Sequence, residues 1–245
     1  NPGSMDAATL AARIEQVNTR VTDSINKRFI RGLDLTVSTT TVTVSAGAAV
    51  IPSTGAPLEV SAPVTANIGT TTASTWYHVY LYSNNGTPAI EISTTVPTPY
   101  AYPAHTKTGD TSRRYLGSFR VDSAGTVRGL DAIDGVAMYR GDWSTVGRML
   151  AGGTAQSITA VAIDTVVPVT AQTIIHTTDN KASTGISQFL TTSGADGYMS
   201  TCFPGGKYIN PNTPLRSYPN IYYQYVTAPT GGGLNIDIGG YTYAR

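Results

Sequence analysis

The sequence predicts a mainly β protein that begins with a short N-terminal coiled coil, continues through a β collar domain and ends in an antiparallel β-sandwich. Apolar residues follow a helical period only before Gly32, the period then changes to two, and short apolar runs separated by turn residues continue to the C-terminal end. We therefore expect a coiled-coil helix at 6–31, the shaft-like collar at 32–135 and the sandwich at 136–245. Residues 1–5 resemble a tag-cleavage remnant and are left out of the fold.

The helix at 6–31 is predicted from an apolar stripe with heptad spacing. The spacing departs from the heptad pattern between Val21 and Ile25, a step of four residues that resembles a stutter and would locally unwind a supercoil. The expected seam residues between identical helices are Leu10, Ile14, Val17, Val21 and Ile25. An amphipathic helix packed on its own domain would show similar spacing and remains the alternative. Three heptads are marginal alone, so the downstream domains are expected to supply most of the association energy.

The collar is predicted from alternating residues at 33–37, 42–44 and 58–60, which indicate half-buried strands. The segment 76–82 is apolar or aromatic on both faces, so it is expected at the centre of a sheet or beneath a neighbouring subunit. Asn85 and Gly86 then predict a tight hairpin turn into the next strand.

The C-terminal sandwich is predicted from short apolar runs separated by turn residues. These runs lie at 158–169, 174–175, 189–190, 198–203, 221–226 and 234–238. The absence of a repeat of fixed period argues against a solenoid or a long β-helix.

Composition excludes several classes of partner and site. Charged residues make up 13% of the chain and the formal net charge is +1. The protein therefore has no long-range electrostatic field that would steer it to nucleic acid, and nucleic acid is not predicted as a partner. Cys202 is the single cysteine, which excludes an intrachain disulfide, and it is predicted to be a buried apolar residue. Neither a membrane-spanning run nor a signal pattern is present, which favours synthesis in the cytoplasm.

Three segments carry a resemblance to a known family. They are Trp-Tyr-His-Val-Tyr-Leu at 76–81, Glu-Ile-Ser-Thr-Thr-Val-Pro at 91–97, and Arg-Tyr-Leu-Gly-Ser-Phe at 114–119 with the turn at 122–125. Together they resemble a module of tail fibre and baseplate-associated proteins of bacteriophages and prophages. The resemblance covers about the first half of the chain and consists of strand and turn signatures without catalytic meaning.

The resemblance implies a parallel homotrimer, with a trimeric coiled coil, in the tail fibre of a virion. It also implies synthesis in the cytoplasm of the bacterial host, contact with other virion tail or baseplate proteins, and host recognition by the distal tip. We therefore expect a phage tail fibre protein that attaches to the host through its C-terminal tip. A cell-surface glycan and an outer-membrane receptor are both open as its ligand. The alternatives are a structural virion component without receptor binding, such as a capsid fibre or baseplate connector, and a glycan-cleaving tailspike.

An enzyme is not predicted, and neither catalytic residues nor cofactors are expected. A glycan-cleaving site needs two carboxylates about 5 to 9 Å apart. The nearest sequence neighbours are Asp131 and Asp134, with Asp142 further on, and such a cluster is more typical of a turn. The Arg113-Arg114 pair is likewise expected in a solvated turn.

A metal site is not predicted either. His78, His105 and His176 are scattered and follow no metal-binding spacing. A threefold axis that brings three copies of one histidine around an ion is the alternative.

The receptor site is predicted on a strand at 216–226, within a sequence that has 15 Tyr against 4 Phe. Alternation turns Ile221, Tyr223 and Tyr225 into the sandwich. The outward residues, and the expected receptor-binding set, are Arg216, Tyr218, Asn220, Tyr222 and Gln224. Tyrosine rings beside amides and a guanidinium can stack on a sugar face and bond its hydroxyls. A subunit interface uses the same residue types, and Pro219 could break the alternation early.

Overall fold

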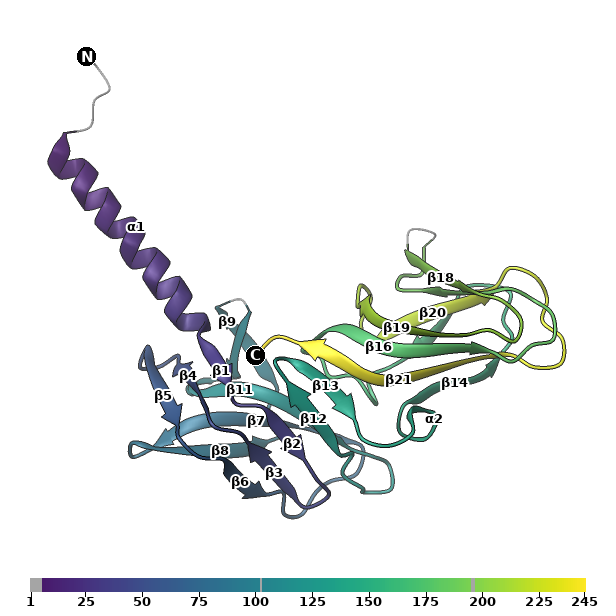
Figure 1. Ribbon diagram of the computed structural model, residues 1–245, viewed down its shortest axis with the longest axis horizontal. Coiled ribbons are helices and arrows are strands. Elements are labelled where there is room, and N and C mark those ends of the chain that lie inside the picture. The colour runs from purple at the N-terminus through teal and green to yellow at the C-terminus, as the bar shows by residue number, and fades with distance from the viewer. Residues whose placement is uncertain (1–5, 102, 195–196) are drawn as a thin grey trace.

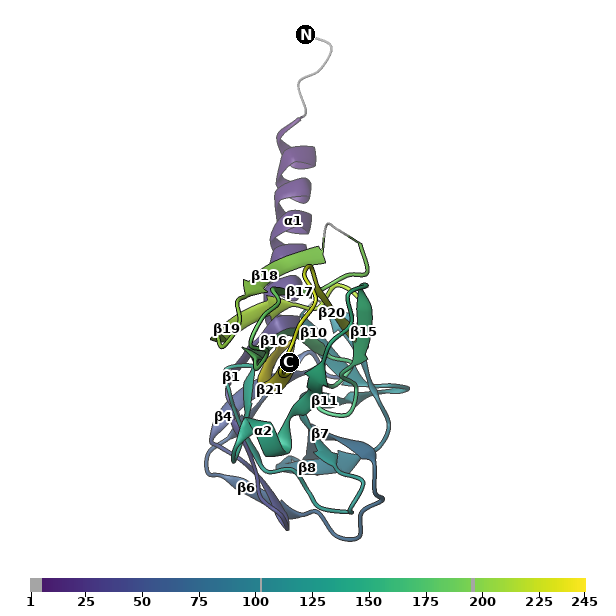
Figure 2. The same cartoon turned by 90° about the vertical axis from the view of Figure 1, so that its right-hand side faces the viewer.

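The computed structural model describes residues 6–101, 103–194 and 197–245, so the expected tag remnant at 1–5 lies outside the described residues. The protein is mainly β, as predicted, and its sheets are built from antiparallel pairs. Two β lobes lie side by side, and helix α1 (Ala7–Arg28) projects from the first of them (Figure 1). Seen along the long axis of the molecule, the N-terminal part of the helix extends beyond the strands (Figure 2).

Helix α1 begins at a capped end. The Asp6 carboxylate accepts hydrogen bonds from the Thr9 amide at 2.9 Å and from the Thr9 hydroxyl at 2.8 Å, as a residue before the first turn should. Of the expected seam residues, Leu10, Ile14 and Val17 are 49%, 53% and 56% exposed. The side chains of Val21 and Ile25 lie outside the described residues. The apolar stripe of the first turns is therefore not buried by its own chain.

The first lobe contains two sheets of its own and part of a third. The small sheet has the order β1 (Ile30–Gly32), β4 (Gly47–Ile51), β5 (Ala56–Val60). The second has the order β8 (Thr87–Ser93), β7 (Thr75–Asn84), β11 (Asp110–Val121), β10 (Ala104–Lys107), β9 (Pro97–Ala101). The third contributes β12 (Leu130–Ile133), β2 (Leu35–Val37), β3 (Thr41–Val44), β6 (Val64–Asn67).

The aromatic strand β7 is central, as the sequence predicted, because β8 and β11 pair with its two edges. Val79, Tyr80 and Leu81 are fully buried within the chain itself. Asn85 and Gly86 have φ angles of 50° and 88°, the positive values that a tight two-residue hairpin requires. The predicted turn into β8 is therefore confirmed.

The second lobe is a sandwich of two antiparallel sheets. The first sheet includes β19 (Lys207–Pro214), β16 (Ala171–Asn180), β21 (Leu234–Tyr243), β13 (Val136–Tyr139) and, paired with β21, β14 (Arg148–Gly153), which follows the short helix α2 (Trp143–Val146). The second has the order β15 (Thr159–Ala162), β20 (Asn220–Tyr225), β17 (Ser187–Leu190), β18 (Tyr198–Cys202). Their inner faces meet where the His176 ring stacks on Phe189 with centroids 4.3 Å apart. Cys202, at the end of β18, is buried, as predicted.

One continuous sheet joins the lobes. β12 pairs with β13 around the turn at Gly135, and β13 pairs with β21. β21 runs back from the second lobe to the first, where the chain ends (Figure 1). The hydroxyls of Tyr241 and Tyr243 donate to the carbonyls of Ser118 and Leu116 at 3.0 and 2.8 Å. The expected boundary between 135 and 136 falls in this turn, and as a division into domains it stays a prediction.

The solvated turn expected at Arg113-Arg114 is wrong. Both residues lie on β11, and Arg114 is fully buried. Its Nη2 group donates to the carbonyl of Arg245 at 3.0 Å. The reason is non-local, because acceptors for this guanidinium come from distant parts of the chain, the second being the Arg28 carbonyl at 3.4 Å.

Candidate functional site

The expected receptor strand is shorter than predicted but alternates as predicted. β20 spans Asn220–Tyr225, with Ile221, Tyr223 and Tyr225 buried in the sandwich. The intervening residues, Asn220, Tyr222 and Gln224, are partly exposed on the outer face. The alternation is therefore confirmed, whereas receptor binding by this face stays a prediction.

The outer face of β20 is uncharged and carries the aromatic ring of Tyr222, which is paired with Ala160 of β15 and with Leu190 of β17. Ala160, on the adjacent strand β15, is exposed directly opposite Tyr222. On the other side the Gln224 Nε2 group donates to Gln188 Oε1 of β17 at 2.7 Å, which fixes both amides. The face can therefore offer a flat ring and pre-oriented amide groups to a partner.

Arg216 and Tyr218 do not belong to β20, contrary to the predicted strand at 216–226. They lie in the connection after β19, where the Asn220 amide donates to the carbonyl of Ser217 at 2.8 Å and closes a turn. Arg216 is exposed, but Tyr218 is half-buried and its hydroxyl donates to the Val167 carbonyl at 3.2 Å. The polar tip of Tyr218 is thus used within the chain. A proline before the strand has no amide hydrogen for a ladder, which explains the late start.

The three aspartates expected to cluster have separate partners. Asp131 lies on β12 and pairs with Arg140 at 2.6 Å, a hydrogen bond that lowers the pKa of its carboxyl. Asp134 occupies the following turn, with a φ of 48°, and pairs with Arg245 at 3.1 Å. Asp142 caps α2 by accepting from the Ser144 amide at 2.8 Å. A local turn is therefore the correct interpretation for Asp134 but wrong for Asp131, which is in a strand.

The histidines are separate as well. His78 and His176 are buried in different lobes, and burial lowers the pKa of each to about 4. His105 is partly exposed, and its Nδ1 atom lies 2.9 Å from the Pro103 carbonyl oxygen. The buried positions of His78 and His176 are incompatible with a histidine ring around a threefold axis. Within residues 6–101, 103–194 and 197–245, no group of three His, Cys, Asp or Glu side chains is placed to hold a metal ion.

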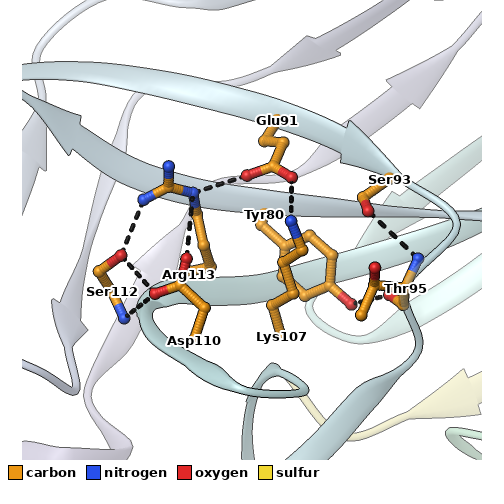
Figure 3. Close-up of polar contacts among 8 residues, drawn as sticks. All are labelled: Tyr80, Glu91, Ser93, Thr95, Lys107, Asp110, Ser112 and Arg113. Atoms are coloured by element: carbon orange, nitrogen blue, oxygen red, sulfur yellow. Dashed lines mark hydrogen bonds and ion pairs between the residues drawn. The ribbon is translucent and has the colours of Figure 1, made fainter.

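A polar network on the first lobe involves Glu91 (Figure 3). Its carboxylate accepts from the Lys107 ammonium and from Arg113 Nε at 2.6 Å. Burial opposes ionisation of Glu91, but these two hydrogen bonds and the positive charges of Lys107 and Arg113 together lower its pKa. The Arg113 guanidinium also lies 4.0 Å from the centre of the Tyr82 ring. The network connects β8, β10 and β11. Its two acids, Glu91 and Asp110, balance its two bases, Lys107 and Arg113, so we interpret it as structural.

A depression that the sequence did not reveal lies on the outer face of the second lobe, with a volume of about 560 Å³. Its lining comes from α2, β14, β16, β19 and β21 and includes Trp143, Arg148, Asp179, Lys207, Asn235 and Asp237. Residues this far apart form no local motif. The available signal was alternation, which places Asp179 on one face of its strand and Asn235 and Asp237 on one face of theirs.

No protein-family model and no curated protein matches the chain. The resemblance to phage tail fibre proteins therefore stays a prediction.

Neither of the helices in the described part of the chain combines the length and apolar character that a bilayer span needs.

Proposed function

We propose that this chain is a bacteriophage tail fibre protein that attaches the virion to its host as a homotrimer. A trimeric coiled coil at 6–31 leads into a collar at 32–135 and a receptor-binding tip at 136–245. The observation that carries the proposal is the exposed apolar stripe of the projecting helix α1, with Leu10 and Ile14 about half exposed. Such a stripe needs cover, which parallel copies of the same helix provide.

The tip is proposed to bind a cell-surface glycan or an outer-membrane receptor. The uncharged face around Tyr222 supports this role, because aromatic rings with fixed amides suit recognition of hydroxyl-rich surfaces. The formal net charge of +1 supports a partner other than nucleic acid. The proposed protein is not an enzyme and uses no cofactor, an interpretation supported by the separate structural partners of Asp131 and Asp134.

Two measurements test the proposal. Light scattering should give three times the 25.7 kDa chain mass, and the labelled trimer should bind saturably to cells of a susceptible bacterium and slow adsorption of a phage that infects it. A trimer that binds no bacterium in a broad panel would instead be a structural virion component. Release of reducing ends from host polysaccharide would favour the tailspike.

A further inference from the structure

The depression on the second lobe has a floor that is built by strand pairing. Asp179 of β16 is opposite Asn235 of β21, and Thr177 is opposite Asp237. On the other edge of β16, Lys207 of β19 is opposite Asp179. Side chains of directly paired residues point to the same face of a sheet. These polar groups therefore share one surface, with Asp179 and Asp237 only 8% and 5% exposed.

One wall of the depression is the indole ring of Trp143. A Cβ atom built on Gly239 would lie 1.9 Å from Trp143 Cε2, so the ring is seated on the bare backbone of β21. Asp142 fixes the start of α2 by its hydrogen bond to the Ser144 amide. Trp143 nevertheless remains partly exposed, and that exposed part lines the depression. The ring is thus a rigid apolar surface beside a polar floor.

The polar groups are held in place, but they retain hydrogen-bonding capacity. Asp237 pairs with Arg148, including an Nη2 to Oδ2 contact of 3.1 Å, and Asp179 pairs with Lys181 at 2.9 Å. Asn235 Oδ1 accepts from the Gly152 amide at 2.8 Å, which leaves its NH₂ group to donate elsewhere. Among the described residues Lys207 has no ion-pair partner within 4 Å.

The charge balance of the lining selects the class of ligand. Three acids, Asp142, Asp179 and Asp237, are matched by three bases, Arg148, Lys181 and Lys207, so the lining has no formal net charge. A phosphate or polyanion site would need surplus positive charge. Hydroxyl groups both donate and accept, so they match a floor of carboxylates, an amide and an ammonium.

We propose that this depression binds a neutral or zwitterionic saccharide, with one sugar ring stacked on Trp143 and its hydroxyls bonded to Asp179, Asn235 and Lys207. Aromatic rings have the flat apolar face that such stacking uses, and the depression is within the size range of small-ligand sites. This inference rests on the proposed function, because it names a glycan as the ligand of the tip and gives it a second site away from β20.

The chain offers its own optical probe, since it contains two tryptophans. Trp76 lies on β7 in the first lobe, so a Trp76→Phe variant leaves Trp143 as the single emitter. Titration of this variant with neutral mono- and disaccharides, N-acetylated sugars and a zwitterionic amino-sugar disaccharide should change Trp143 emission saturably for at least one probe. Heparin oligosaccharides and inorganic phosphate should produce no saturable change.

Calorimetry with the best saccharide should then show at least a tenfold loss of affinity in Trp143→Ala. Lys207→Ala, on an exposed side chain without an ion pair, should lose several-fold without loss of folding, while Trp76→Phe should bind as the unmodified protein. Binding of no saccharide at millimolar concentration, preference for heparin, or unchanged affinity in both Trp143→Ala and Lys207→Ala would overturn the inference. A change from trimer to smaller species in Trp143→Ala, with normal affinity in Lys207→Ala, would assign the depression to a subunit contact instead.

Cell binding separates this inference from the proposed function. If the unmodified protein binds no saccharide and the Trp143→Ala variant still binds cells normally, the saccharide site is ruled out and the attachment role stands. Saccharide binding by a protein that attaches to no cell would leave the site and remove the role.

Discussion

At the scale of single residues, two histidines are held in the interior with their rings neutral. His78 Nδ1 lies 2.7 Å from the Ser118 hydroxyl, and His176 Nε2 lies 3.1 Å from the Thr213 hydroxyl. Burial lowers the pKa of both to about 4, from an ordinary value of 6.5. The unfolded chain therefore binds protons between pH 6.5 and 4 that the folded chain does not bind.

This difference predicts that the free energy of unfolding falls as pH falls below 6.5. Between pH 7.5 and 5.5 each buried histidine should cost about 1 kcal/mol, since one pKa unit corresponds to about 1.4 kcal/mol. Urea unfolding at pH 7.5, 6.5 and 5.5 measures the slope while staying above the carboxylate range. His176→Gln should remove about half of it, whereas the partly exposed His105→Gln should remove less. An equal slope in His176→Gln and the unmodified protein would contradict the prediction.

At the scale of elements, helix α1 and strand β20 each present a surface that its own chain leaves uncovered. The helix exposes an apolar stripe, and the strand exposes a ring between amides. Substitutions on the helix surface are therefore expected to weaken trimer assembly, and substitutions on the strand surface to weaken adhesion to cells.

The helix surface predicts that Leu10→Ser with Val17→Ser weakens the trimer without abolishing it. Removing two partly exposed aliphatic side chains from each seam takes away apolar burial of about 1 to 2 kcal/mol per side chain, while the lobes keep their own contacts. Light scattering over a dilution series should show dissociation at higher concentration than for the unmodified protein. The matched control is Ala12→Ser with Gln16→Ser, on the exposed opposite face of the heptad, which should dissociate normally.

The strand surface predicts that Tyr222→Ala lowers adsorption to host cells. An aromatic anchor is worth about 1 to 3 kcal/mol per copy, and three copies multiply its effect through avidity. Tyr82→Ala, on a partly exposed tyrosine of the first lobe, should adsorb normally. A Tyr222→Ala trimer that adsorbs as the unmodified protein would exclude this face, and a variant that dissociates to monomers would assign it to a subunit interface.

At the scale of the whole molecule, the lobes share a sheet and a core. β21 is paired with β16 in the second lobe and ends with Tyr243 against Tyr115 in the first, with ring centroids 6.0 Å apart. Arg245 pairs with Asp134 and donates to the Gly32 carbonyl at 3.0 Å, close to the start of the first lobe. Unfolding of either lobe would remove partners from the other.

This sharing predicts one cooperative transition. Trp76→Phe leaves an emitter in the second lobe. Trp143→Phe leaves Trp76 on β7, whose indole donates to the Asp164 carbonyl at 2.7 Å, so this emitter reports on the first lobe and on its contact with the second. The urea midpoint of each variant is measured by tryptophan emission, and the change that the substitution itself causes in the midpoint measured by circular dichroism is subtracted. The two corrected midpoints should coincide. Well-separated midpoints would mean that the lobes unfold independently and would favour the domain division between 135 and 136.

The sequence by itself determined the local features of this protein. Periodicity is a property of neighbouring residues, so it was enough to predict a helix before Gly32, alternating strands after it, and the inward side chains of β20. Asn85 and Gly86 predicted their turn because the required backbone angles depend on those residues alone. The burial of Cys202 followed from its own chemistry.

Only the tertiary structure decided which strands pair and what their pairing brings together. The insertion of β21 between β13 and β16 depends on contacts between residues far apart in the chain, and alternation does not specify a partner. The same is true of Arg114, whose acceptor is at residue 245, and of the depression, whose lining extends from Gly141 to Asp237. Each of these sites is made by side chains that become neighbours only when non-local strands pair, which is why no local pattern could predict it.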